Sequence, residues 1–120
     1  MVTKASQPAP GFNRELTEII HRFCQALEKA GIHCQQILLY GSQRSGKARE
    51  GSDIDLIVVS PDWARYGWRE RLELLGITAA RILEPIQAQG FTPDEIAQRD
   101  ISPFWQYILD HEATIVSSAF

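Results

Sequence analysis

Two short apolar runs on either side of a polar turn constrain the fold of this chain more than any other feature. The first run spans residues 35–40, and the second begins at Asp53 and ends at Val59. Their length and apolar content favour buried β-strands, and Pro61 ends the second one. The residues between them, 41–52, are polar and contain glycine, with room for a short helix. The sequence therefore predicts a sheet that contains both runs.

The rest of the chain alternates between helical and extended segments. Apolar spacings of three and four residues indicate helices, while Thr and Ser before Pro are typical helix starts. Pro85 near the start of one extended segment indicates an edge strand or the first residues of a strand. The predicted segments are helices over 12–30 and 68–80, an extended segment over 82–91, helix starts at Thr92 and Ser102, and a short strand over 113–116. This order predicts an α/β fold with a three- to four-stranded mixed sheet and flanking helices.

Length and composition indicate a single domain. The chain has 120 residues, of which 44% are hydrophobic and 22% charged, as in ordinary globular proteins. We expect a flexible lead over residues 1–11 and one domain over residues 12–120. At this length no second, acceptor-binding domain is expected. The net charge of −3 argues against a basic surface for nucleic acid, so no direct nucleic-acid binding is expected.

Two further features of the sequence indicate the cellular compartment. It has no apolar run near the ~18 residues of a membrane span, so no membrane association is expected. Cys24 and Cys34 lie ten residues apart and match neither a zinc site nor a disulfide framework. These features predict a protein of the reducing cytoplasm.

Asp53 and Asp55 open the second predicted strand. Because side chains alternate along a strand, the two carboxylates point to the same face, while Ile54 and Leu56 point to the other. Two adjacent carboxylates repel each other unless water or a cation lies between them. Mg²⁺ prefers oxygen ligands together with substrate phosphates, and a carboxylate pair can bridge two such ions. The alternative is that they are two solvated aspartates at the start of a strand, without a metal-binding role.

Gly41 and Ser42 directly follow the first strand. Glycine lets the backbone approach a phosphate closely, and a serine at a helix start offers a hydroxyl and an N–H group. Phosphates would then lie between this turn and the carboxylate pair. The basic residues Arg44, Lys47 and Arg49 could contact the same phosphates, or they could lie in a solvated turn.

The same turn also contains the pattern GxxxxGK of a P-loop. In a P-loop the next residue is Ser or Thr, which binds Mg²⁺, but here it is Ala48. A P-loop also opens a long helix, whereas Gly51 and Ser52 interrupt the chain a few residues later. The sequence therefore argues against this alternative.

The segment YGSQRSGKAREGSDIDLIVV resembles the signature of the DNA polymerase β-like nucleotidyltransferase superfamily. More narrowly, the chain resembles the minimal nucleotidyltransferases (MNT), because Gly41-Ser42, ten residues and Asp53-Ile54-Asp55 match their motif without a gap. The resemblance covers about residues 12–116, and residues 40–59 carry most of it. It implies a small nucleotidyltransferase fold in which the residues matching Asp53 and Asp55 hold Mg²⁺. Those matching Gly41 and Ser42 hold the nucleoside triphosphate.

In that family a third carboxylate, on the next strand, completes the metal site. The usual spacing places this position at Gln87, and the nearest acid is Glu84, three residues earlier. Strict alternation puts the two on opposite faces, although a bulge at Pro85 could re-aim Glu84. Two expectations follow: either Glu84 is the third ligand, or the third ligand is missing.

The resemblance implies Mg²⁺-dependent transfer of a nucleoside monophosphate, AMP from ATP, onto a hydroxyl with release of pyrophosphate. Because the chain is short, the expected acceptor is a partner protein, and the resemblance implies a HEPN-type toxin with this chain as its antitoxin. A second hypothesis is a binding module with a degenerate metal site that neutralises a HEPN partner by contact. A third is a homodimer that modifies a small molecule. Trp63, Trp68 and Trp105 are expected in the core or an interface, with stacking on a base as the alternative.

Overall fold

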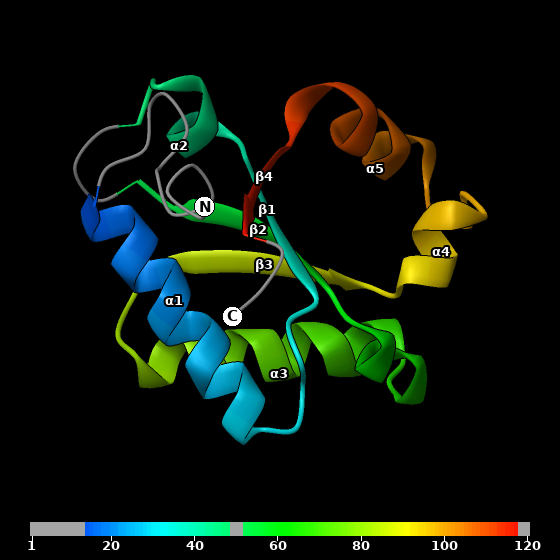
Figure 1. The fold of residues 1–120 in the computed structure, drawn as a ribbon, viewed down its shortest axis with the longest axis horizontal. Coiled ribbons are helices and arrows are strands. Elements are labelled where there is room, and N and C mark those ends of the chain that lie inside the picture. Colours follow the sequence, from blue (N-terminus) through cyan, green and yellow to red (C-terminus); the bar gives the residue numbers. More distant parts are fainter. Residues whose placement is uncertain (1–13, 49–51, 118–120) are drawn as a thin grey trace, which may run out of the picture.

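The four strands of the protein form one mixed sheet in the order β3-β2-β1-β4 (Figure 1). The computed structural model describes residues 14–48 and 52–117, so the predicted lead and Arg49 lie outside the described residues. β2 pairs antiparallel with β1 and parallel with β3, and β4 pairs antiparallel with β1. In chain order the elements are α1 (Arg14–Lys29), β1 (Gln36–Tyr40), α2 (Ser42–Ser45), β2 (Ile54–Val59), the 3₁₀ turn η2 (Pro61–Arg65), α3 (Trp68–Arg81), β3 (Ile86–Phe91), α4 (Pro93–Ala97), α5 (Pro103–Tyr107), the π-helical turn η3 (Ile108–Glu112) and β4 (Thr114–Ser117).

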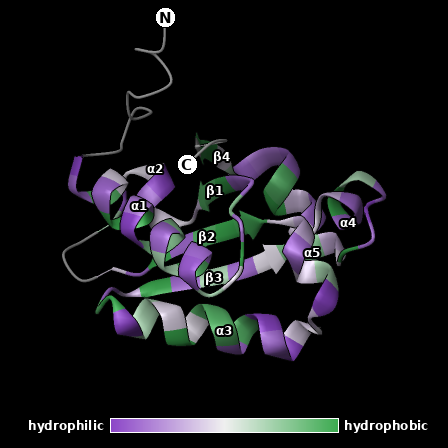
Figure 2. Cartoon of the chain, turned by 60° about the horizontal axis from the view of Figure 1, so that its bottom comes forward, coloured by the Kyte–Doolittle hydropathy of each residue, from purple (hydrophilic) through white to green (hydrophobic). Residues whose placement is uncertain are grey.

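The sheet carries a core on each of its faces. On one face, the inward residues of β1 and β2 pack against α1 and α3, which lie beside each other (Figure 1). On the other face, a smaller cluster of Leu38, Ile57, Val59 and Phe91 packs under α5 and η3. Figure 2 shows β1 and β2 as largely hydrophobic, whereas β3 mixes hydrophobic and hydrophilic residues. No helix among the described residues is long and apolar enough to span a membrane.

The predicted elements are confirmed with two differences of extent. The extended segment expected from residue 82 begins only at Ile86, because α3 continues to Arg81 and a turn follows. In that turn Leu83 takes a left-handed backbone conformation with φ of 58°. The helix that starts after Ser102 changes to a π-helical turn at Ile108. The mixed sheet of four strands and the position of β3 at its edge, directly after Pro85, are as predicted.

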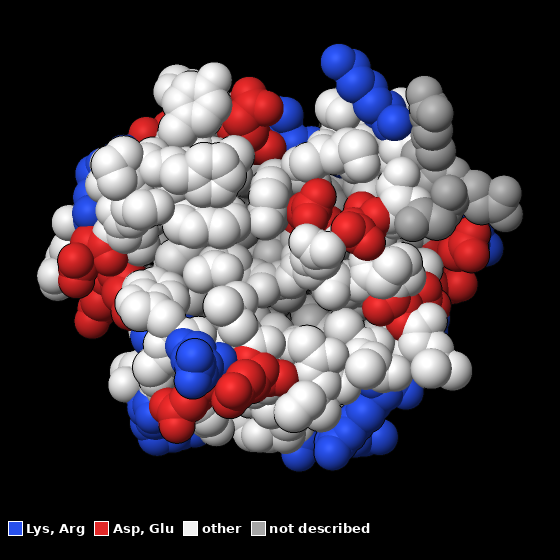
Figure 3. Space-filling model, turned by 180° about the vertical axis from the view of Figure 1, so that it is seen from behind, with Lys and Arg blue, Asp and Glu red and all other residues white. Residues whose placement is uncertain are grey.

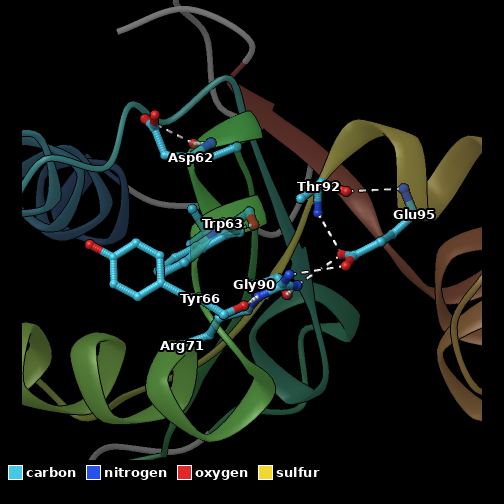
Figure 4. Close-up of polar contacts among 9 residues, drawn as sticks. Asp62, Trp63, Tyr66, Arg71, Gly90, Thr92 and Glu95 are labelled. Atoms are coloured by element: carbon cyan, nitrogen blue, oxygen red, sulfur yellow. Dashed lines mark hydrogen bonds and ion pairs between the residues drawn. The ribbon is translucent and has the colours of Figure 1, made fainter.

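A buried arginine ties the end of β3 to the helices around it (Figure 4). The Arg71 side chain, 6% exposed, donates to both carboxylate oxygens of Glu95 at 2.8 and 3.0 Å. It also donates to the backbone carbonyls of Gly90 and Tyr66, at 3.1 and 3.0 Å. Glu95 in turn accepts the Thr92 N–H at 2.8 Å, which caps α4. A guanidinium has five fixed donors, so this single side chain orients α3, β3 and α4 together.

Trp63 packs closely against β3 at Gly90. Its ring is fully buried, and its indole N–H donates to the Val58 carbonyl at 3.1 Å. A Cβ atom at Gly90 would come within 2.6 Å of this ring, so only glycine fits there. All three tryptophans were expected in the core or an interface; Trp63 is fully buried in the core, whereas Trp68 is 45% exposed.

Candidate active site

The two predicted metal-binding carboxylates lie where β2 begins. Asp53 directly precedes β2, and Asp55 is its second residue. Ile54, Leu56 and Val58 are buried in the larger core, so the alternation of the strand turns Asp53 and Asp55 to the opposite face, as predicted. The register places Tyr40 of β1 and Gln87 of β3 beside Asp55. Tyr40, Asp55 and Gln87 therefore form a row across the sheet.

Gly41 lies directly against Asp55. A Cβ atom on Gly41 would overlap the Asp55 carboxylate, and Gly41 has φ of 77°, a conformation that favours glycine. The chain can therefore bring the Gly41-Ser42 turn next to the carboxylates only with glycine at this position. The Ser42 hydroxyl has no hydrogen-bond partner within residues 14–48 and 52–117. The structure thus brings the predicted phosphate turn and Asp55 together.

The electrostatics of Asp55 are unfavourable in the protein alone. Partial burial and the neighbouring charge of Asp53 both raise the pKa of Asp55. Among the described residues, no hydrogen-bond donor reaches its carboxylate. Burial and the charge of Asp55 also raise the pKa of Tyr40 to about 12. Perturbed groups of this kind without a compensating partner are typical of functional sites.

The position expected for a third carboxylate is occupied by an amide that touches the pair. The Gln87 Nε2 atom donates to Asp53 Oδ2 at 2.8 Å. Glu84 instead forms an ion pair with Arg22 of α1, at 2.6 Å. No group of three or more His, Cys, Asp or Glu side chains suited to a metal occurs among the described residues. The expectation that Glu84 joins Asp53 and Asp55 is therefore not met, because Glu84 precedes β3 and no bulge re-aims it.

The basic residues of the turn have different environments. Arg44 Nε donates to the Thr114 hydroxyl at 2.9 Å, which ties the turn to β4. Lys47 is exposed, and its ammonium has no partner in the described part of the chain. On the face shown in Figure 3, basic side chains stand in separate groups and form no continuous surface. α2 has only four residues, which does not fit the long helix of a P-loop.

This donor set fits a magnesium ion shared with a substrate. Two carboxylates on one face supply the oxygen ligands that Mg²⁺ prefers, and Mg²⁺ commonly takes its remaining ligands from phosphates and water. The Gln87 amide faces Asp53 with its N–H₂ group, which is a hydrogen-bond donor and not a metal ligand. The residues therefore fit a site with two carboxylate ligands and not one with three.

A cavity of about 440 Å³ lies further along the same face, beside β3. Its walls include three aromatic rings, of Trp68, Phe91 and Trp105. Gln89, two residues beyond Gln87, and Ser102 supply polar atoms. Gln89 was not among the site residues predicted from the sequence. The sequence does contain a signal for it: because side chains alternate along a strand, Gln87, Gln89 and Phe91 all lie on the face of Asp55.

The comparisons with known proteins agree with this geometry. A family model for the nucleotidyltransferase domain matches residues 16–117. No curated protein matches the sequence. The chain is similar in structure to a protein in the crystal structure of a toxin-antitoxin with AMP-PNP, with a TM-score of 0.58 and 19% identity over 86% of this chain and 73% of that chain. It is also similar to a candidate nucleotidyltransferase from Sulfolobus solfataricus, with a TM-score of 0.52 and 13% identity over 82% of this chain and 73% of that chain.

At these identities the two structures show a shared fold, the small nucleotidyltransferase fold that the sequence predicts. The family model covers the helix before β1, the Gly41-Ser42 turn, the carboxylate pair and the rest of the sheet. The chain therefore belongs to the nucleotidyltransferase domain family.

Proposed function

We propose that this protein transfers a nucleoside monophosphate, AMP from ATP, onto a hydroxyl of a partner protein in a Mg²⁺-dependent reaction. The observation that carries the proposal is the contact of Gly41 with Asp55, because it brings the Gly41-Ser42 turn beside two adjacent carboxylates. Asp55 has a raised pKa and no donor within residues 14–48 and 52–117. A divalent cation would remove both unfavourable features.

Each residue of the site then has a separate task. Asp53 and Asp55 would hold Mg²⁺, which when bound would offset the charge of the triphosphate. Gly41 and Ser42 hold the outer phosphates through backbone N–H groups and the unpartnered hydroxyl. Lys47 can reach a phosphate from the solvent side, while Arg44 holds the turn against β4 through Thr114. The acceptor hydroxyl oxygen would bond to the α-phosphorus as the bond to the β-phosphate breaks, pyrophosphate would leave, and the hydroxyl proton would pass to solvent.

A partner protein as acceptor is supported by exposed apolar side chains on and near the last elements. Phe104 and Tyr107 of α5, and Ile115 of β4, each expose more than half of their surface. β4 is also an edge strand of the sheet. The similar structure of a toxin-antitoxin with AMP-PNP and the resemblance to MNT proteins support a HEPN-type toxin as this partner. The protein would then act as an antitoxin in the cytoplasm, in a hetero-oligomer with its target.

A second function is favoured by Gln87. Its amide occupies one oxygen of Asp53, and the third carboxylate that would activate an acceptor hydroxyl is absent from the described residues. A chain with this site could bind a nucleotide and neutralise its partner by contact alone. The two functions differ in one respect: only the first forms a covalent product.

A labelling experiment separates them. The protein would be incubated with Mg²⁺ and ATP labelled in the α-phosphate, in a lysate of cells that contain the partner, and in parallel with γ-labelled ATP. The proposal predicts a protein band labelled from the α-position only, which disappears with Asp55→Asn and persists with Gln36→Leu at the far end of the same sheet face. Neutralisation by the Asp53→Asn and Asp55→Asn variants without a labelled band would establish the contact mechanism instead.

A further inference from the structure

The aromatic cavity beside β3 continues directly from the carboxylate row. Gln87 lies beside Asp55, and Gln89 lies next along the same face of β3. Residues two apart in a strand are separated by roughly 7 Å. Phe91, two residues further, contacts Trp68 and Trp105 edge to face, with ring centroids 5.6 and 5.7 Å apart. The cavity therefore begins two residues along β3 from Gln87, which lies beside the proposed position of the metal.

The aromatic part of the cavity lining suits a flat ring system. Trp68 remains 45% exposed although one face of its indole lies over the Arg71 guanidinium, at 4.4 Å. Arg99 and Asp100 also line the cavity, and the charge of Arg99 is balanced by Asp110, at 2.8 Å. The volume of about 440 Å³ falls in the range of small-molecule sites and exceeds the space that a single side chain fills. Aromatic walls favour stacking with a planar ligand.

Gln89 adds a specific polar element to these walls. Its side chain is half-buried, and its amide has no hydrogen-bond partner within residues 14–48 and 52–117. A glutamine amide presents one donor and one acceptor side by side. This pair matches N7 and the exocyclic amino group of adenine, whereas guanine presents two acceptors at the same edge. A single hydroxyl, such as that of an acceptor side chain, would satisfy only half of it.

The order of the strands indicates which end of a nucleotide reaches the cavity. The Gly41-Ser42 turn follows β1, the carboxylates belong to the start of β2, and the cavity lies on β3. A triphosphate held by the turn, with its α-phosphate at Asp55, continues through the ribose toward β3. We propose that the aromatic cavity formed by Trp68, Phe91 and Trp105 binds the base of the nucleotide and that Gln89 selects adenine. This inference rests on the proposed function, because it uses the same carboxylates and turn.

Calorimetry on the purified protein with Mg²⁺ tests the inference with four probes: ATP, GTP, ribose 5-triphosphate and inorganic tripolyphosphate. Because stacking of one base contributes a free energy equivalent to about tenfold in affinity, ATP should bind about tenfold more tightly than ribose 5-triphosphate. ATP should also bind more tightly than GTP. Gln89→Leu should remove the preference for ATP over GTP and leave tripolyphosphate binding unchanged. Gln36→Leu, a half-buried strand position in a different hollow, is the matched control and should change none of these affinities.

The outcomes distinguish the inference from the function on which it rests. If ATP, ribose 5-triphosphate and tripolyphosphate bind equally well, the base does not use the cavity, and the inference is overturned while the proposed function stands. If none of the probes binds, the proposed function fails and the inference fails with it. If Gln89→Leu weakened the binding of all four probes equally, the effect would be structural, and the inference would also be overturned. Trp68→Leu provides a second variant, for which a selective loss of ATP affinity is expected.

Discussion

Gly41 and Asp55 lie in contact, and no side chain larger than hydrogen fits at position 41 while Asp55 keeps its place. This contact joins the two halves of the sequence motif in space. A glycine can be required for two reasons, a positive φ or a lack of space for a Cβ atom, and only Gly41 is required for both. Gly41 and Gly46 both have positive φ, of 77° and 79°, but a Cβ atom at Gly46 would meet nothing within 4 Å.

Gly41→Ala and Gly46→Ala should therefore have different effects on function. Gly46 has the left-handed conformation, in which an alanine costs about 1–2 kcal/mol of stability. Gly41 combines its positive φ with ψ of −157°, a region adopted almost only by glycine, where an alanine costs about 1–3 kcal/mol. Only Gly41→Ala displaces the Asp55 carboxylate, so it should abolish Mg²⁺-dependent nucleotide binding. Thermal unfolding and nucleotide titration of both variants check this. Equal retention of binding by the two variants would show that the contact has no functional role.

Asp55→Asn should make the protein more stable and inactive at the same time. The pKa of Asp55 is raised, so its ionised form costs folding free energy at neutral pH, and the amide removes this cost. Because Asp55 is partly exposed to solvent, we expect a gain of only about 0.5 kcal/mol. The advantage should shrink as the pH falls through the pKa of Asp55, because the wild-type side chain then becomes neutral as well. Melting curves against pH would contradict this if Asp55→Asn were the less stable protein at pH 7.

Gln87→Glu should convert the site to one with three carboxylates. It removes the hydrogen bond to Asp53 and adds a like charge to the row, so the metal-free variant should melt at a lower temperature than the wild type. Its affinity for Mn²⁺, measured by titration, should rise on the order of tenfold, as expected when an oxygen ligand is gained.

Gln36→Glu, which adds the same charge at the far end of the face, is the control and should leave the Mn²⁺ affinity unchanged. A Gln87→Glu variant whose Mn²⁺ affinity matches that of the wild type would mean that position 87 does not reach the metal.

Glu95→Gln should destabilise the protein, because it leaves the buried Arg71 guanidinium without its counter-ion. We expect a loss of about 2 kcal/mol at pH 7, below the value for fully buried pairs because Glu95 is partly exposed. Burial alone would raise the pKa of Glu95, but the hydrogen bonds from Arg71 and Thr92 lower it overall. The stability contributed by Glu95 is therefore present above its unfolded pKa and is lost as the pH falls through its lower, folded pKa.

Urea unfolding at several pH values tests this account. The variant should show a smaller loss of stability on acidification than the wild type. Asp110→Asn, in the exposed pair with Arg99, is the matched control and should change stability little. Equal losses at pH 7 for the two variants would contradict the role assigned to the Arg71–Glu95 pair.

The features that could be predicted from the sequence are those set by local rules. The alternation along a strand places Asp53 and Asp55 on one face whatever the rest of the fold does. Likewise, Thr92 and Glu95 form a capping box within a single helical turn, so the start of α4 is encoded locally. The short length of α2, which excludes the P-loop alternative, follows from the glycines that surround it.

The features that the sequence did not reveal depend on contacts between distant elements. Whether Glu84 or Gln87 meets the carboxylates is decided by where α3 ends and by the pairing of β2 with β3. Arg22, which pairs with Glu84, is 62 residues away from it in the chain. The aromatic cavity likewise combines side chains from α3, β3 and the segment from Arg99 to Trp105. No periodicity within one element indicates that these three regions meet.

The most direct test of the central claim is a Mg²⁺-dependent binding measurement with an ATP analogue that cannot be cleaved between the α- and β-phosphates. The account predicts that the wild type binds this analogue with Mg²⁺ and loses it with EDTA. It also predicts that Asp53→Asn and Asp55→Asn each abolish the metal-dependent part, while Gln36→Leu retains it. Binding that is unaffected by EDTA and by both aspartate variants would contradict the assignment of Asp53 and Asp55 as the metal-binding centre of a nucleotidyltransferase.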